Sequence, residues 1–384
     1  MSLNTLSVEE ERAAASSATQ IAERPTNELR RVIFPYRPVL DVVRFLAAIW
    51  VMLSHTGAVK GGGHAVSIFF VLSGYLIGGQ LVDEKRRRGG IEIPEFYFKR
   101  ITRIWIPYFI VLAGFIALFL ARRQDSVPGF YGRMFGAVTY TYNLVNSVRG
   151  NIHPTWVSFN QIWSLSVEEQ FYLVVPLLIR WIPMRLIVPV SVLLTIQFLL
   201  RFPPYAGLSL GVLLAAASER RPSESLSPQR SALLGAIFVA FFAVLFAVGQ
   251  SRISPASWIT YLISGIVVLL ADRIPLPRRT HNGLRYLGLM TYSYYLIHGL
   301  PAYFLGALYR RVSHSAADPV WLNIAFGLLA LPLSFLFVRW IELPVLRIRG
   351  DMLKVKSPWI PFAPWLAWGL SSVGLIGLVY FALH

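Results

Sequence analysis

The sequence predicts an all-α, polytopic integral membrane protein with about ten or eleven transmembrane helices arranged around a polar cavity. Two observations carry this prediction. Of the 384 residues, 55% are hydrophobic and only 14% are charged, and the mean hydropathy is +0.56. In addition, apolar runs long enough to cross a bilayer recur along the chain between short polar loops. Several soluble domains are therefore excluded, although the length alone would allow them.

The chain opens with a polar arm, residues 1–33, which lacks the apolar core of a signal peptide and is expected to be flexible. Residues 34–350 are expected to form one transmembrane domain, and residues 351–384 to add a further C-terminal helix. The predicted spans cover approximately residues 39–58, 65–82, 104–121, 162–182, 185–201, 204–218, 231–249, 255–271, 286–309, 320–341 and 359–382.

Charge and cysteine content narrow the function classes. The formal charge is +17, but the basic residues lie in short loops rather than on one soluble face, so no nucleic-acid partner is predicted. Most of the 36 Lys and Arg residues fall in the N-terminal arm and in alternate loops, which predicts a cytoplasmic N-terminus and, with eleven spans, an external C-terminus. The chain has no cysteine and no histidine pair at metal-ligand spacing, so neither thiolate chemistry nor a metal site is expected.

The first span carries three ionisable residues, Asp41, Arg44 and His55. At about 100° per residue they fall on one helix face, with Arg44 and His55 about 16 Å apart along the axis. Charged groups at membrane depth are costly unless they face a partner or a cavity, so this polar stripe is a candidate functional surface. The alternative is that Asp41 and Arg44 are interfacial anchors and that His55 only ends the span.

Arg100 and Arg103 begin the third span at positions i and i+3, where two guanidinium groups on one helix face could grip phosphates. Basic residues at a span end also anchor to lipid headgroups, which is the ordinary alternative. In the second span, Ser73 and Gly74 favour close helix packing more than nucleophilic chemistry.

Glu168 and Glu169 lie near the start of the span 162–182 and project about 100° apart. Glu168 shares a face with Ser164 and Tyr172, which we expect to be its hydrogen-bond partners. Glu169 is as consistent with a solvated span end as with a site. A second intramembrane histidine, His298, is expected to be a buried structural hydrogen-bond donor.

Taken together, six motifs occur in order along the chain. They are Asp41-x-x-Arg44 with His55 after ten further residues, FFVLSGYL at 69–76, Arg100-x-x-Arg103, WSLSVEEQFY at 163–172, YYLIH at 294–298, and Glu342-x-Pro344. This set resembles the acyltransferase-3 family of membrane-bound O-acyltransferases, which acylate bacterial surface glycans, nodulation factors and macrolides. The resemblance covers about residues 36–348. The last predicted span lies beyond the ten that the family core usually has.

The resemblance implies that His55 is catalytic, that Arg44 and Glu168 act with it, and that Arg100 and Arg103 serve the acyl-coenzyme A side. It leaves Asp41, Ser73, Tyr75, Glu169 and His298 as candidate supporting residues. A neutral imidazole, with a reference pKa of about 6.5, can take the proton of an acceptor hydroxyl that attacks a thioester. Coenzyme A is polyanionic and cytoplasmic, which suits the Arg-rich inner face.

The expected function is transfer of an acyl group, with acetyl as the first choice, from cytoplasmic acyl-CoA to a hydroxyl of a cell-surface or exported carbohydrate. The partners are then acyl-CoA, a carbohydrate or lipid-linked glycan, and the lipid of the bacterial inner membrane; no covalently bound cofactor is expected. A polar stripe also lines the path of a carrier or flippase, and the acceptor could be a small molecule such as a macrolide. A non-catalytic subunit of an export complex is the third alternative.

Overall fold

The computed structural model describes residues 36–121, 129–149, 161–218, 227–314 and 319–383, and all regular structure in these ranges is helical. The all-α prediction is therefore confirmed. The predicted polar arm, residues 1–33, lies outside the described residues. The α-helices are α2 (Pro38–His55), α3 (Gly62–Ser73), α4 (Gly79–Arg88), α5 (Ile93–Arg100), α6 (Ile106–Ala121), α7 (Phe130–Val138), α8 (Tyr142–Arg149), α9 (Ile162–Trp181), α10 (Met184–Arg201), α11 (Pro203–Ala217), α12 (Pro228–Gln250), α13 (Trp258–Arg273), α14 (His281–Ile297), α15 (Gly299–Ser313), α16 (Val320–Phe337), α17 (Leu343–Lys354) and α18 (Ala363–Leu383).

Within the described ranges, eight helical segments are long and apolar enough to cross a membrane. Each of the eleven predicted apolar runs corresponds to helix, but three of them yield helices below spanning length: α11 has 15 residues, α13 has 16 and α14 has 17. The run predicted at 286–309 is divided at His298 into α14 and α15. The chain is thus a multi-pass membrane protein whose shorter helices pack among the longer ones.

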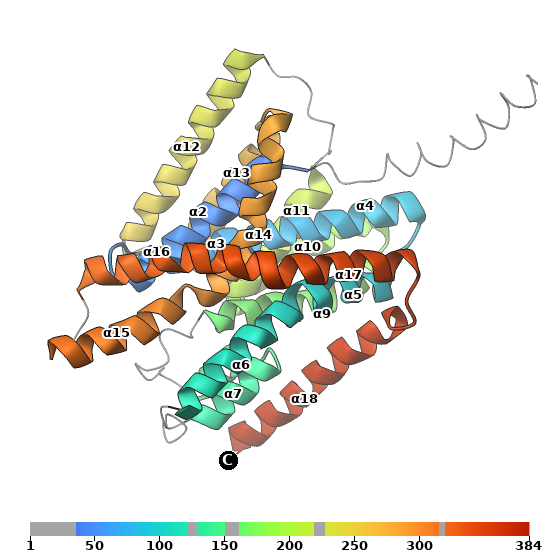
Figure 1. The fold of residues 1–384 in the computed structure, drawn as a ribbon. Helices are drawn as coiled ribbons and strands as arrows, with labels where there is room; N and C mark the ends of the chain where they lie inside the picture. The colour runs from blue at the N-terminus through green and yellow to red at the C-terminus, as the bar shows by residue number, and fades with distance from the viewer. Residues whose placement is uncertain (1–35, 122–128, 150–160, 219–226, 315–318, 384) are drawn as a thin grey trace, which may run out of the picture. The chain divides into compact units, whose positions relative to one another are not determined.

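Three of the spanning segments are composite helices interrupted by a π-helical turn. The turn η1 (Gly74–Gly78) joins α3 to α4, η2 (Ile101–Trp105) joins α5 to α6, and η6 (Val338–Glu342) joins α16 to α17. The last of these runs for 35 residues, Val320–Lys354, and is the long orange-to-red helix of Figure 1. A π-turn inserts one residue into a helix and is found often at functional sites.

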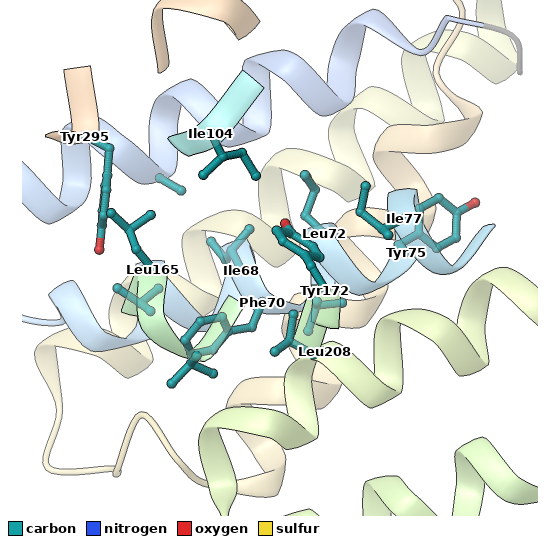
Figure 2. Close-up of a cluster of buried hydrophobic side chains, with 14 of the residues drawn as sticks. Ile68, Phe70, Leu72, Tyr75, Ile77, Ile104, Leu165, Tyr172, Leu208 and Tyr295 are labelled. Carbon is teal, nitrogen blue, oxygen red and sulfur yellow. The ribbon is translucent and has the colours of Figure 1, made fainter. Parts of the chain in front are cut away.

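The composite helix α3–η1–α4 forms the centre of the packing. In its most apolar stretch, 78% of the residues are buried, whereas only 11% are buried in the corresponding stretch of α12. Helix α12 therefore lies at the periphery (Figure 1). Helix α2 packs against α3, α13 and α14. Figure 2 shows part of the core, in which Ile68 and Phe70 of α3 meet Leu165 of α9 and Leu208 of α11.

Small residues allow α11 to approach the central helix closely. A Cβ atom on Gly74 would lie 1.9 Å from the carbonyl oxygen of Leu208, and one on Gly211 would lie 2.2 Å from that of Val71. Only glycine fits at such backbone-to-backbone contacts, which are typical of membrane helices. The prediction that Ser73 and Gly74 form a packing seam is confirmed for Gly74. Tyr75, a candidate supporting residue, is 1% exposed and lies in the same core.

Candidate active site

The structure brings His55 and His298 together, although 242 residues separate them. His55 is the last residue of α2, and His298 directly follows α14. His55 Nδ1 lies 2.9 Å from His298 Nε2, and the two rings stack with centroids 5.1 Å apart. His298 is only 3% exposed, whereas His55 is an exposed residue. We call these two residues the histidine pair; it has one buried and one accessible imidazole.

A second polar group lies at the opposite end of α2. Asp41 and Arg44 form an ion pair of 2.9 Å between Asp41 Oδ1 and Arg44 Nη1, and both side chains are mostly buried. Helix α14 leaves room for this pair at Gly288, where a Cβ atom would lie 2.3 Å from Asp41 Cγ. The predicted polar stripe therefore faces α14 and does not simply anchor the helix at the interface.

Glu168, on α9, contacts the composite helix α3–η1–α4. Its Oε1 accepts a hydrogen bond of 2.7 Å from Ser73 Oγ, and the charges of Arg44 and Arg100 act on it. Tyr172, the other expected partner, lies close enough to interact with Glu168 electrostatically. The prediction that Ser164 would be a partner is wrong, because Ser164 Oγ lies 2.7 Å from Tyr295 Oη and bonds to the Gln161 carbonyl instead.

Glu169 and Arg100 line a small cavity with an accessible volume of about 20 Å³, which is room for about one water molecule. Glu169 Oε2 accepts from Trp105 Nε1 at 2.8 Å, while its Oε1 is buried without a partner among the described residues. Glu169 is thus a buried group and not a solvated span end. The other lining residues are Tyr97, Ile101, Trp105, Tyr140, Gln170, Tyr172, Leu173, Ala367 and Ser371.

The two predicted arginines have different neighbours. Arg100 lies over the rings of Phe96 and Tyr172, 5.6 and 5.4 Å from their centroids, and its buried Nε has no partner in the described part of the chain. Arg103 lies within η2, where the strongest charges acting on it are those of Arg44, Glu342 and Asp41. The π-turn that follows Arg100 changes the i, i+3 geometry of a regular α-helix, while the charges of Arg100 and Arg103 still act on one another.

Sequence reasoning missed one member of this group, Arg349. It lies on α17, its Nε is buried without a partner among the described residues, and its charge interacts with those of Arg100 and Arg103. Glu342, at the end of η6, accepts a hydrogen bond from Ser293 and acts on Arg103. We call these seven residues the charged cluster: Asp41, Arg44, Arg100, Arg103, Glu168, Glu342 and Arg349. The pattern Glu342-x-Pro344 followed by Arg347 and Arg349 is the only sequence signal for the last of them.

Comparison with known proteins identifies the family of the chain. A family model described as an acyltransferase domain matches residues 37–339, which contain the histidine pair and most of the charged cluster. The chain belongs to the acyltransferase-3 family. The match to an acyltransferase domain supports an enzyme rather than a carrier.

Two curated relatives of this acyltransferase-3 chain are O-acetyltransferases, one of them named as putative. O-acetyltransferase OatA of Staphylococcus aureus (strain NCTC 8325 / PS 47) is 31% identical over 159 residues, which are 38% of this chain and 25% of the relative. The putative O-acetyltransferase SAS0844 of Staphylococcus aureus (strain MSSA476) is 30% identical over 152 residues, with the same shares. The match thus spans about a quarter of the length of these relatives. No solved structure matches the chain.

Part of the site lies outside the residues that the family model matches. Glu342 of η6 and Arg349 of α17 belong to the charged cluster, and Ala367 and Ser371 of α18 line the small cavity at Arg100. Helix α18 packs against α5, α7 and α8. The C-terminal segment 351–384 therefore contributes to the surroundings of Arg100, and it is not only an added span.

Proposed function

We propose that the chain is a membrane O-acyltransferase that moves an acyl group, with acetyl as the first choice, from cytoplasmic acyl-CoA to a hydroxyl of a cell-surface or exported carbohydrate. His55 is the general base, and Arg44 and Glu168 act with it. Arg100 and Arg103, together with Arg349, hold the phosphates of the donor. The membrane is the bacterial inner membrane, with the N-terminus in the cytoplasm.

The observation that carries this proposal is the histidine pair. His55 offers an accessible imidazole whose other nitrogen is bonded to a buried partner, which is the arrangement that a general base needs. The acceptor O–H attacks the thioester carbonyl while His55 takes the proton. The C–O bond forms, the C–S bond breaks, and the thiolate of coenzyme A leaves. Return of the proton from His55 to the thiolate restores the base and completes the reaction.

The distance between the two polar groups suits the donor. Arg44 and His55 are about 16 Å apart along α2 by helix geometry. In coenzyme A the phosphates and the thioester are separated by the extended pantetheine arm. Phosphates held at the charged cluster would therefore present the thioester near the histidine pair.

The other basic segment near this face, 85–88, is largely engaged elsewhere. Lys85 Nζ donates to the carbonyl oxygens of Ile179, Arg180 and Ile182 and so caps the end of α9. Arg86 donates to the Ala216 carbonyl at the end of α11. By contrast, the buried Nε atoms of Arg100 and Arg349 have no partner within the described ranges, which supports these side chains as the donor site.

Release of coenzyme A by the purified protein tests the proposal directly. The chain has no cysteine, so a thiol reagent reports only the free thiol of coenzyme A. We expect acetyl-CoA cleavage that is stimulated by a glycan fragment, and mass spectrometry should find the acetyl group on a sugar hydroxyl. His55→Ala is expected to retain less than about a tenth of wild-type turnover while keeping its abundance and melting temperature, because a general base contributes about 10²–10⁴-fold.

The acceptor is tested in the same assay with a macrolide in place of the glycan. Acetylation of the macrolide but not of the glycan would replace the carbohydrate with a small-molecule acceptor. Full activity of His55→Ala would remove His55 from the mechanism. A protein that binds acetyl-CoA but never cleaves it, with any acceptor, would contradict the proposed function as a whole.

A further inference from the structure

The hydrogen bonds of the histidine pair fix where its protons lie. His298 Nδ1 is 2.8 Å from the carbonyl oxygen of Tyr295. A backbone carbonyl can only accept, so His298 Nδ1 must carry the hydrogen of that bond. The other nitrogen, His298 Nε2, is the atom that lies 2.9 Å from His55 Nδ1. The role of Nε2 therefore depends on whether His298 is neutral or doubly protonated.

Burial selects the neutral form of His298. The side chain is 3% exposed, and its ring packs against those of Tyr294 and Tyr295. Within the described part of the chain, no acidic side chain bonds to either histidine. A buried imidazolium without a counter-ion is costly. His298 Nε2 therefore keeps its lone pair and accepts, and His55 Nδ1–H donates.

We infer that His298 is a positioning residue, which holds His55 in the Nδ1–H tautomer and leaves the lone pair of His55 Nε2 for the substrate. The inference rests on the proposed role of His55 as the general base. The Tyr295 carbonyl holds His298, and His298 in turn orients His55. When His55 Nε2 takes a proton, its Nδ1–H bond to His298 becomes charge-assisted and therefore stronger, which stabilises the imidazolium.

Contacts around the end of α14 hold the relay in place, by which we mean the chain of hydrogen bonds from the Tyr295 carbonyl through His298 to His55. The backbone N–H of His298 donates to the Tyr294 carbonyl at 2.9 Å. Tyr295 Oη lies 2.7 Å from Ser164 Oγ, and Gln161 Nε2 donates to the Leu296 carbonyl at 3.2 Å. The start of α9 thus clamps the segment that carries the Tyr295 carbonyl. His298 is therefore a rigid partner, and it can orient the imidazole of His55 although His55 itself is exposed.

Two substitutions separate positioning from packing. His298→Leu introduces an apolar side chain of similar size, which fills the same space but removes the acceptor for His55 Nδ1–H. His298→Gln restores an acceptor, the amide oxygen, at about the same reach. The matched control is His64→Leu, because His64 is also buried, at 2% exposure, and neither of its ring nitrogens has a partner among the described residues.

The first measurement is the steady-state kinetics of these variants with acetyl-CoA. We expect His298→Leu to lower kcat about 100-fold, within the range for loss of a general base, while KM for acetyl-CoA stays within about twofold. His298→Gln should recover at least about a tenth of wild-type kcat, and His64→Leu should resemble wild type. Equal loss in the Gln and Leu variants, or kcat of His298→Leu within about threefold of wild type, would overturn the inference.

The second measurement does not depend on activity. Solid-state ¹⁵N spectra of histidine-labelled protein show which ring nitrogen is protonated, and the signals of His55 are identified by their loss in His55→Gln. We expect protonated Nδ1 and unprotonated Nε2 in wild type, with a shift toward the Nε2–H tautomer in His298→Leu. A wild-type Nε2–H tautomer refutes the positioning role. If instead the tautomer is as expected but His55→Ala is active, the proposed function fails and the relay stands.

Discussion

Replacing Arg100 with lysine is expected to weaken binding of the acyl donor although the charge is kept. The guanidinium of Arg100 stacks over Phe96 and Tyr172, and its buried Nε has no partner in the described residues. A lysine cannot form the bidentate fork and does not stack in the same way. The proposal requires that this side chain bonds a phosphate of coenzyme A, so the lysine variant loses at least one charge-assisted hydrogen bond.

The size of the effect follows from that bond. A hydrogen bond to a charged group contributes about 1.5–3 kcal/mol, and each 1.4 kcal/mol is about tenfold in affinity. The Kd of acetyl-CoA should therefore rise about 10- to 100-fold in Arg100→Lys, measured by isothermal titration calorimetry on the purified protein. KM for the acceptor should hardly change.

Lys99→Ala is the matched control on the same helix. Lys99 is bonded to Glu95 at 2.5 Å, but 46% of its side chain is exposed, and such surface pairs contribute little. This variant loses a full positive charge one residue away, yet its Kd should stay within about threefold of wild type. Normal donor affinity in Arg100→Lys, or an equal loss in both variants, would refute specific phosphate recognition and make Arg100 an anchor to lipid headgroups.

Two further predictions concern packing and topology. Gly288→Ala drives a Cβ atom into the Asp41 carboxylate, so we expect a loss of about 1–3 kcal/mol in stability, measured as a lower melting temperature. The control is Gly283→Ala on the same helix, which has open space around it and should not be destabilising. A cysteine at Arg87, near the end of α4, should be protected from membrane-impermeant thiol reagents in intact cells, and one at the exposed Ala58 should react, because the two positions are predicted on opposite sides of the membrane. The reverse labelling pattern would overturn the proposed orientation.

The sequence was sufficient to predict features that depend on one helix. The hydropathy pattern predicted helix at every apolar run, and the wheel positions of Asp41 and Arg44 predicted a buried polar face on α2, where the structure has an ion pair. These predictions succeed because helix periodicity fixes which side chains share a face. The polar stripe on α2 is a property of the local sequence.

Contacts between distant helices were not predictable in this way. His298 was expected to be a structural donor, and it does donate to the Tyr295 carbonyl, but its bond to His55 depends on how α14 packs against α2. Ser73 was expected to pack, and instead its hydroxyl bonds to Glu168 on α9. Each of these bonds joins two helices that are separated by long stretches of chain, so no local period contains the information.

The π-turn η2 alters the regular helix geometry that the prediction for Arg100 and Arg103 assumed. A one-residue insertion rotates everything after it by about 100° relative to a regular α-helix. The three turns η1, η2 and η6 occur beside Ser73, Arg100 and Glu342, so each redirects residues at the polar centre of the protein. The sequence offers no period that marks them.

Helix α2 lacks such a turn, and this has a consequence for the proposed chemistry. Because α2 is regular from Pro38 to His55, the charged cluster and the histidine pair are held at one fixed separation and on one face. The composite helices around it supply the groups that complete each end: Ser73 and Arg100 beside Arg44 and Glu168, while α14 brings His298 to His55. In the proposed reaction, a regular helix would therefore set the distance between the donor phosphates and the base, and the π-turns adjust the direction of the side chains that surround it.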